Sequence, residues 1–122
     1  MKSFIAVIIL FACITVTSAQ TDATVEQLKK VYAENVSWTD AGDLSYDANT
    51  KVLSVKNYRI PVSKNTLVQT DKNSAHFAMQ QGTAVTDVND PAWRRAEFII
   101  PFSDKKSAEE FTKHFNKLIE AN

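Results

Sequence analysis

The chain has 122 residues, with 14 basic and 14 acidic side chains and a formal net charge of zero. This balance lacks the net basic charge typical of nucleic-acid-binding domains, and a total of two glycines excludes a glycine-rich phosphate loop. About 100 residues are enough for one domain with its own hydrophobic core.

The first 19 residues have the layout of a secretory signal peptide. Lys2 supplies a positive charge, residues 3–14 are almost wholly apolar, and small residues at 17–19 precede Gln20. The apolar run is shorter than the ~20 residues of a membrane-spanning helix. We therefore expect cleavage after Ala19, a secreted or periplasmic protein, and no integral membrane span after cleavage.

Cys13 offers an alternative to simple secretion, because residues 10–13 resemble the lipobox of bacterial lipoproteins. In that family Cys13 would become the lipidated first residue. Phe11 is bulky where a small residue is usual, and apolar residues follow Cys13 instead of a polar tether, so we favour the signal peptide. The domain expected at residues 20–122 then contains no thiol, and disulfides or cysteine metal ligands are excluded there.

Apolar residues at helical spacing predict a first helix over residues 24–35. Thr24 and Gln27 fit a capping box at its start, and Asn35 is expected to end it. The apolar positions form one narrow face, which should pack on the rest of the domain; they are Val25, Leu28, Val31 and Tyr32.

Turn signals about every ten residues predict an antiparallel meander of about six to seven short strands within residues 43–102. Pro61 cannot donate a ladder hydrogen bond, so the run at 58–62 should be an edge or a strand end. Its first part, residues 58–60, could add a partner strand. Phe77 and Met79 are expected to share one face.

The strongest strand is expected to run unbroken from Trp93 to Phe102, with Ile99 and Ile100 partly buried on both faces. A polar turn and a helix over residues 104–121 follow, capped by Ser103 or Asp104. This helix carries an apolar stripe at three- and four-residue spacing. The stripe consists of Ala108, Phe111, Phe115, Leu118 and Ile119.

The element order resembles that of the pleckstrin-homology-like barrels: a strand meander, a final strand ending at residues 98–102, and a C-terminal helix with the Ala-Glu-Glu-Phe start at 108–111. The resemblance covers about residues 43–121. It implies an α+β fold in which a curled antiparallel sheet or small barrel is closed by the C-terminal helix, with the N-terminal helix as an addition.

Lipid-binding members of that family use clustered basic residues around the first hairpin. The nearest candidates here do not match their spacing; they are Lys51, Lys56, Arg59 and Lys64. Export would also separate the domain from cytosolic phosphoinositides. The resemblance therefore implies a fold and not that ligand.

Neither histidine has a partner that would indicate a metal site or a catalytic site. His76 lies on an expected strand and His114 on the last helix, and no second histidine or cysteine stands at ligand spacing. A strained Gly-x-Ser-x-Gly turn, which would expose a nucleophilic serine, is absent from the sequence. No catalytic, cofactor-binding or metal-binding residue is assigned.

Two further polar segments have simpler explanations than a binding site. Residues 87–90 contain several oxygen ligands but lack the glycine and distal glutamate of a calcium loop, so a solvated turn is expected. Arg94 and Arg95 beside Trp93 could bind an anion or stack on an aromatic ligand. Strand alternation places the two arginines on opposite faces, which weakens that hypothesis.

The sequence thus predicts a small exported, non-enzymatic binding or accessory domain of the envelope or the extracellular space. Its partner would be another protein, or a small apolar ligand held between sheet and helix. One alternative is a small hydrolase whose site assembles from distant polar residues such as His76 and His114. Another is a lipid-anchored envelope protein that uses Cys13.

Overall fold

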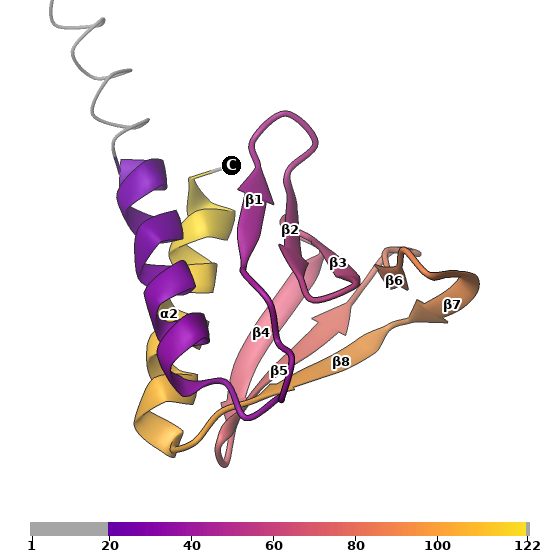
Figure 1. Ribbon diagram of the computed structural model, residues 1–122. Coiled ribbons are helices and arrows are strands. Elements are labelled where there is room, and N and C mark those ends of the chain that lie inside the picture. Colours follow the sequence, from indigo (N-terminus) through magenta and orange to yellow (C-terminus); the bar gives the residue numbers. More distant parts are fainter. Residues whose placement is uncertain (1–19, 122) are drawn as a thin grey trace, which may run out of the picture.

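The structure is a computed structural model that describes residues 20–121 (Figure 1). The expected signal peptide and Cys13 lie outside these residues. The described chain contains a helix over residues 20–35, eight strands and a second helix. In order, these are β1 (Ser45–Asp47), β2 (Val52–Val55), β3 (Tyr58–Pro61), β4 (Thr66–Asp71), β5 (Ser74–Met79), β6 (Val85–Asp87), β7 (Asp90–Arg95), β8 (Glu97–Pro101) and α2 (Lys105–Glu120).

The strands form two antiparallel sheets, of orders β1-β2-β3-β6-β7 and β4-β5-β8. Figure 1 shows both helices on one side of the molecule, with β6 and β7 projecting away from them. The predicted α+β class, the antiparallel pairing and the C-terminal helix are confirmed. The finer prediction of a small barrel is not, because the described strands divide between two sheets and do not close into one.

The expected unbroken strand from Trp93 to Phe102 is wrong, because the chain changes sheets within it. β7 ends at Arg95 and pairs with β6, whereas β8 begins at Glu97 and pairs with β5. The backbone between them bends at Ala96, whose carbonyl oxygen accepts a hydrogen bond from the Met79 amide at 2.6 Å. A strand that serves two diverging sheets has to bend where it leaves the first.

The first helix includes residue 20, so the capping box expected at Thr24 is wrong. Thr24 lies inside the helix, and its hydroxyl donates to the carbonyl oxygen of Gln20 at 2.8 Å. Asn35 is the last helical residue, as predicted. Leu28 and Tyr32 are fully buried, and the Tyr32 hydroxyl donates to the carbonyl oxygen of Ala41 at 2.7 Å.

Helix α2 begins as the sequence predicts, with Asp104 as its N-cap. The Asp104 carboxylate accepts a hydrogen bond from the Ser107 amide at 2.7 Å. The predicted apolar stripe faces the core, because four of its five members are buried and the fifth, Ile119, packs against the same cluster. The buried members are Ala108, Phe111, Phe115 and Leu118.

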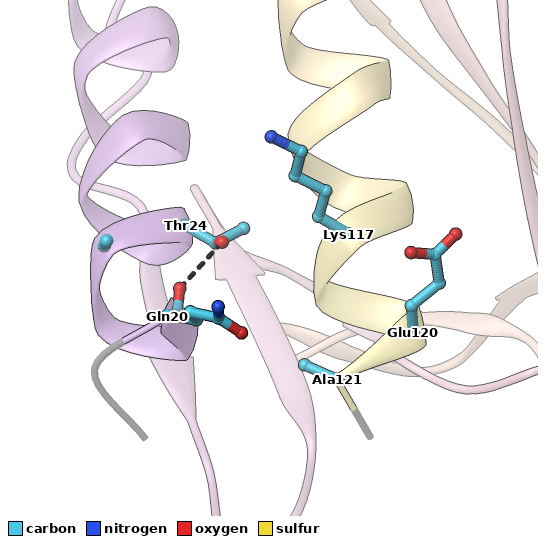
Figure 2. Close-up of a pocket in the computed structure, with 6 residues that line it drawn as sticks. Gln20, Thr24, Lys117, Glu120 and Ala121 are labelled. Carbon is cyan, nitrogen blue, oxygen red and sulfur yellow. Dashed lines mark hydrogen bonds between the residues drawn. The ribbon is translucent and has the colours of Figure 1, made fainter. Parts of the chain in front are cut away.

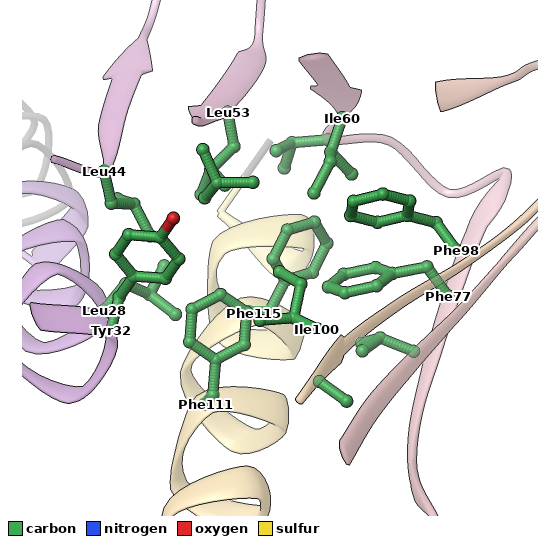
Figure 3. Packing of buried hydrophobic residues seen from close by; sticks show 14 of the residues in the cluster. Leu28, Tyr32, Leu44, Leu53, Ile60, Phe77, Phe98, Ile100, Phe111 and Phe115 are labelled. Atoms are coloured by element: carbon green, nitrogen blue, oxygen red, sulfur yellow. The ribbon is translucent and has the colours of Figure 1, made fainter. Parts of the chain in front are cut away.

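Aromatic rings fill the centre of the core between the helices and the sheets (Figure 3). The ring centroids of Phe77 and Phe115 lie 5.0 Å apart, and those of Phe102 and Phe111 lie 5.1 Å apart. Phe111 and Phe115 are themselves 6.4 Å apart and have no exposed surface. The space beneath these two rings, where a small ligand could have lain, is occupied by other side chains.

The expectation that residues 58–60 form an edge able to add a strand is wrong, whereas the alternative that Pro61 lies at a strand end is correct, because Pro61 is the last residue of β3. β3 lies between β2 and β6, with Tyr58 opposite Val55 on one side and Asp87 on the other. The β4–β5 hairpin separates β3 from β6 in the chain, so no local sequence pattern predicts that β3 and β6 pair. Within the described residues no helix is long and apolar enough to span a membrane.

Candidate binding surface on the three-stranded sheet

The sheet β4-β5-β8 has one face covered and one face open. Helix α2 lies against β4 and β5, and the alternate residues Val68, Phe77 and Ile100 point into the core. The residues between them face outward, and we call this set the outer face. It consists of Leu67, Gln69, His76, Ala78, Glu97 and Ile99.

The strand register arranges the outer face as two parallel rows. One row crosses the sheet through Leu67, Ala78 and Glu97. The other crosses through Gln69, His76 and Ile99. Residues directly opposite each other have Cβ atoms about 4.5–5.5 Å apart, so the six side chains form one contiguous surface.

Leu67 and Ile99 make this surface unusually apolar for a solvent-facing sheet. Their exposed fractions are 43% and 50%. Three large hydrophobic side chains are exposed within residues 20–121, and the third, Val88, lies in the turn between β6 and β7. The two on the outer face come from opposite edge strands of one small sheet and stand at diagonal corners of that face, with Ala78 and His76 on the strand between them.

The exposure of Ile99 corrects the expectation that Ile99 and Ile100 share partial burial. Ile100 has no exposed surface, whereas half of Ile99 is exposed. The two residues point to opposite faces of β8, and only the inner face is covered by α2 and the rest of the core. Sequence alternation cannot show whether the second face has a cover.

A hollow of about 110 Å³ opens on the outer face, lined by Leu67, Gln69, His76 and Ala78. This volume is far below the ~300–1,000 Å³ of pockets that hold small molecules. The hollow therefore suits part of one side chain from another molecule, and it does not suit a cofactor.

Among the described residues, His76 holds the one buried side-chain nitrogen or oxygen atom that has no hydrogen-bond partner. Its Nε2 atom is buried and has no hydrogen-bond partner. The nearest carboxylate oxygen, Oε1 of Glu97, lies 3.9 Å away, which is beyond hydrogen-bonding distance. Because buried polar atoms are nearly always hydrogen-bonded, an incoming group that bonds to Nε2 would be stabilised here.

The structure does not bring the two histidines together. His76 lies on the outer face of the sheet, and His114 lies on α2, which packs against the inner face. His114 Nε2 is 3.5 Å from Oε2 of Glu110. Burial, with a smaller effect from Lys117, lowers the pKa of His114, and Glu110 partly opposes that shift. Residues 20–121 contain no group of three or more histidine, cysteine, aspartate or glutamate side chains that could hold a metal ion.

A larger cleft of about 610 Å³ lies between the first helix and the end of α2 (Figure 2). Gln20, Thr24, Lys117 and Glu120 are among the residues that line it. The Thr24 hydroxyl bonds within its own helix, and the cleft offers no nucleophile held by a base. We assign no chemistry to it.

An aromatic cluster at the other end of the core was not predicted as a unit. Trp38, Tyr58 and Trp93 surround Phe98, with ring centroids 4.9–6.3 Å from it. The guanidinium of Arg95 stands over the Trp93 ring at 5.2 Å, so Arg95 stacks on an aromatic ring of its own chain. All three outer rings are partly buried against the core. The cluster therefore covers this end of the core, and we assign no binding site to it.

No family model, curated protein or solved structure matches the chain.

Proposed function

We propose that the chain is a small exported, non-enzymatic binding domain that docks a partner protein on the outer face of β4-β5-β8. The observation that carries this proposal is the uncovered apolar pair Leu67 and Ile99 on one sheet face. Export rests on the signal-peptide pattern of residues 1–19. The likeness to pleckstrin-homology-like barrels is part of the same proposal, supported by the C-terminal helix packed on antiparallel strands.

The chemistry of the outer face specifies what the partner presents. An apolar side chain of the partner enters the hollow beside Leu67 and Ala78, which removes exposed apolar surface from water. Because Nε2 of His76 is buried, the imidazole has to rotate outward to bond a polar group of the partner. Gln69 and Glu97 are exposed on the same face and occupy its other two corners, so polar side chains flank the apolar ones.

Two alternatives, a small apolar ligand and a hydrolase activity, have less support. A small apolar ligand between sheet and helix would have to displace Phe111 or Phe115, whose rings pack against Phe77 and Phe102. A hydrolase would need His76 or His114 beside a nucleophile. The sheet separates the two histidines, and Nε2 of His76 bonds to no hydroxyl.

Site-specific photocrosslinking in the native extract tests where the partner binds. A photoreactive residue at position 99 should capture one stoichiometric protein, and the same residue at position 88 should not, although Val88 is equally exposed at 54%. Equal capture at both positions, or capture that survives Leu67→Asp, would contradict docking on this face.

The Kd of the purified partner then measures how much the outer face contributes to binding. Ile99→Asp should weaken the Kd by roughly 30-fold or more, the effect of losing a central apolar contact worth ~2 kcal/mol. Val88→Asp is the matched control and should leave the Kd unchanged. Sedimentation of the protein alone tests whether a second copy of the chain binds to the outer face. Self-association abolished by Ile99→Asp would show that a second copy binds instead, and would overturn the proposal of a different partner.

A further inference from the structure

The outer surface of the other sheet carries a row of polar residues that crosses all five strands. The register places Arg59 opposite Thr86, and Thr86 opposite Arg94. On the other side of β3, Arg59 stands opposite Ser54, which in turn stands opposite Ser45. Residues directly opposite in an antiparallel sheet project from the same face, so these five side chains lie in one line.

This line points away from the core. Ile60, the neighbour of Arg59 in β3, has no exposed surface and belongs to the core cluster. Because successive residues of a strand face opposite sides, Arg59 projects outward. Arg94 is exposed, while Arg59 and Thr86 are partly exposed, so solvent reaches all three.

The two arginines stand on either side of the Thr86 hydroxyl. Adjacent strands are ~4.8 Å apart, so the Cα atoms of Arg59 and Arg94, two strands apart, are separated by roughly 10 Å. Two long arginine side chains can converge from that separation on one point above Thr86. Each guanidinium offers a planar fork of donors that matches the oxygens of phosphate-like groups.

Neither arginine is neutralised within the described chain. No carboxylate oxygen of residues 20–121 forms an ion pair with Arg59 or Arg94, and Nη1 of Arg59 donates to the carbonyl oxygen of Tyr58 at 3.0 Å. The acids nearest in the sheet have other partners. Asp87 accepts from the Asn89 amide at 2.8 Å, and Asp90 accepts from the Ala92 amide at 3.2 Å.

We propose that Arg59, Thr86 and Arg94 bind a tetrahedral oxyanion, the sulfate or phosphate group of a free ion or of a monoester. The two guanidinium groups supply charge-assisted hydrogen bonds from opposite sides, and the Thr86 hydroxyl donates a third from below. A bound anion also offsets two positive charges that have no carboxylate partner within residues 20–121. This site is on a different sheet from the proposed docking surface and does not depend on it.

Amide chemical shifts of the isotope-labelled domain, residues 20–122, test the site directly. Sulfate and inorganic phosphate are titrated against chloride at matched ionic strength. The amides of Arg59, Thr86 and Arg94 should shift together and saturate, while those of the outer face stay fixed. A linear, non-saturating drift spread over all basic residues would mean an adventitious ion only and would overturn the proposal.

Arginine variants separate a defined site from general charge. Arg94→Gln should weaken binding about tenfold or more, the effect of losing a charge-assisted hydrogen-bond pair. Arg95→Gln removes the same charge from the adjacent residue, whose side chain stacks on Trp93, and should leave binding unchanged. Equal weakening by both variants would refute the site. Arg94→Lys keeps the positive charge and removes the planar pair of donors. Thr86→Val removes the hydroxyl and keeps a residue that favours strands. Both variants should fold and should bind the anion more weakly.

Methyl phosphate and methyl sulfate distinguish the source of the anion. Tighter binding of a methyl ester than of the corresponding inorganic ion assigns the site to a group carried on a larger molecule. Tighter binding of the inorganic ion assigns it to a free anion. Either result supports the oxyanion site, whereas saturable binding of acetate with equal strength would contradict the tetrahedral preference.

Discussion

Truncation of two adjacent isoleucines, one at a time, distinguishes the buried inner face of the three-stranded sheet from its exposed outer face. Ile100→Ala removes a side chain with no exposed surface, and Ile99→Ala removes the same atoms from a side chain that is 50% exposed. Both substitutions are in β8, which pairs with β5 along its length. The loss of strand propensity, at most about 1 kcal/mol, is therefore similar in both variants, and the difference between them reports burial.

The expected difference follows from the core around Ile100. This residue lies opposite Ala75, which is also fully buried, and belongs to the same core cluster as Phe111 and Phe115. Truncating a fully buried isoleucine costs about 2–5 kcal/mol. At roughly 4–8 °C per kcal/mol for a domain of this size, Ile100→Ala should lower the Tm by about 8–40 °C. Ile99→Ala should leave the free energy of unfolding within about 1 kcal/mol of wild type.

Urea denaturation of the three proteins, followed by far-ultraviolet circular dichroism, gives both free energies with one probe. Ile99→Ala should keep its stability and lose affinity for the docked partner, while Ile100→Ala should lose stability. Equal losses of stability, or a larger loss at position 99, would refute this assignment of faces. A register displaced by one residue would produce that result, because it exchanges the two faces of the strand.

Three other predictions concern the core and its titratable groups. Phe115→Ala should cost about 3–5 kcal/mol, and a Tm close to wild type in thermal denaturation would contradict the aromatic core. Burial raises the pKa of Tyr32 from 10.0 to about 12, so the unfolded chain loses that proton first. Stability should fall between pH 10 and about 12, and less so in Tyr32→Phe, as urea denaturation across that range would show. The pKa of His114 is lowered from its ordinary 6.5, so the unfolded chain takes up a proton first as the pH falls. The free energy of unfolding of wild type should therefore decrease as the pH falls below about 6.5. His114→Asn should remove that part of the pH dependence, and an unchanged dependence in the variant would contradict the burial of His114.

Local patterns in the sequence predicted the inward-facing residues of several elements correctly. Helical spacing identified Phe111 and Phe115 as buried, and strand alternation placed Phe77 and Met79 together on the inner face. The side-chain chemistry of Asp104 predicted the start of α2. These features depend on contacts within one helix or one strand, or on a choice between two faces, and such information lies within a few residues of sequence.

The outer face could not be predicted from the sequence to the same extent. In the sequence, His76 belongs only to the alternative hydrolase hypothesis, and its unpartnered Nε2 depends on distances to Glu97 and to the residues of β4. Ile99 was misassigned because alternation shows which residues share a face and gives no information about what covers that face. Leu67 lies in β4, two strands away from Ile99.

The sequence by itself determined the two helices, the antiparallel α+β class and the core-facing residues of α2. The tertiary structure alone decided which strands are neighbours: β6 returns to β3, and β8 joins β5. Those pairings bend the chain at Ala96, leave one face of the three-stranded sheet open and align Arg59 with Arg94 across Thr86. The physical reason is that strand pairing is settled by contacts between distant segments as they bury a common core, whereas amphipathic periodicity is a property of each segment alone.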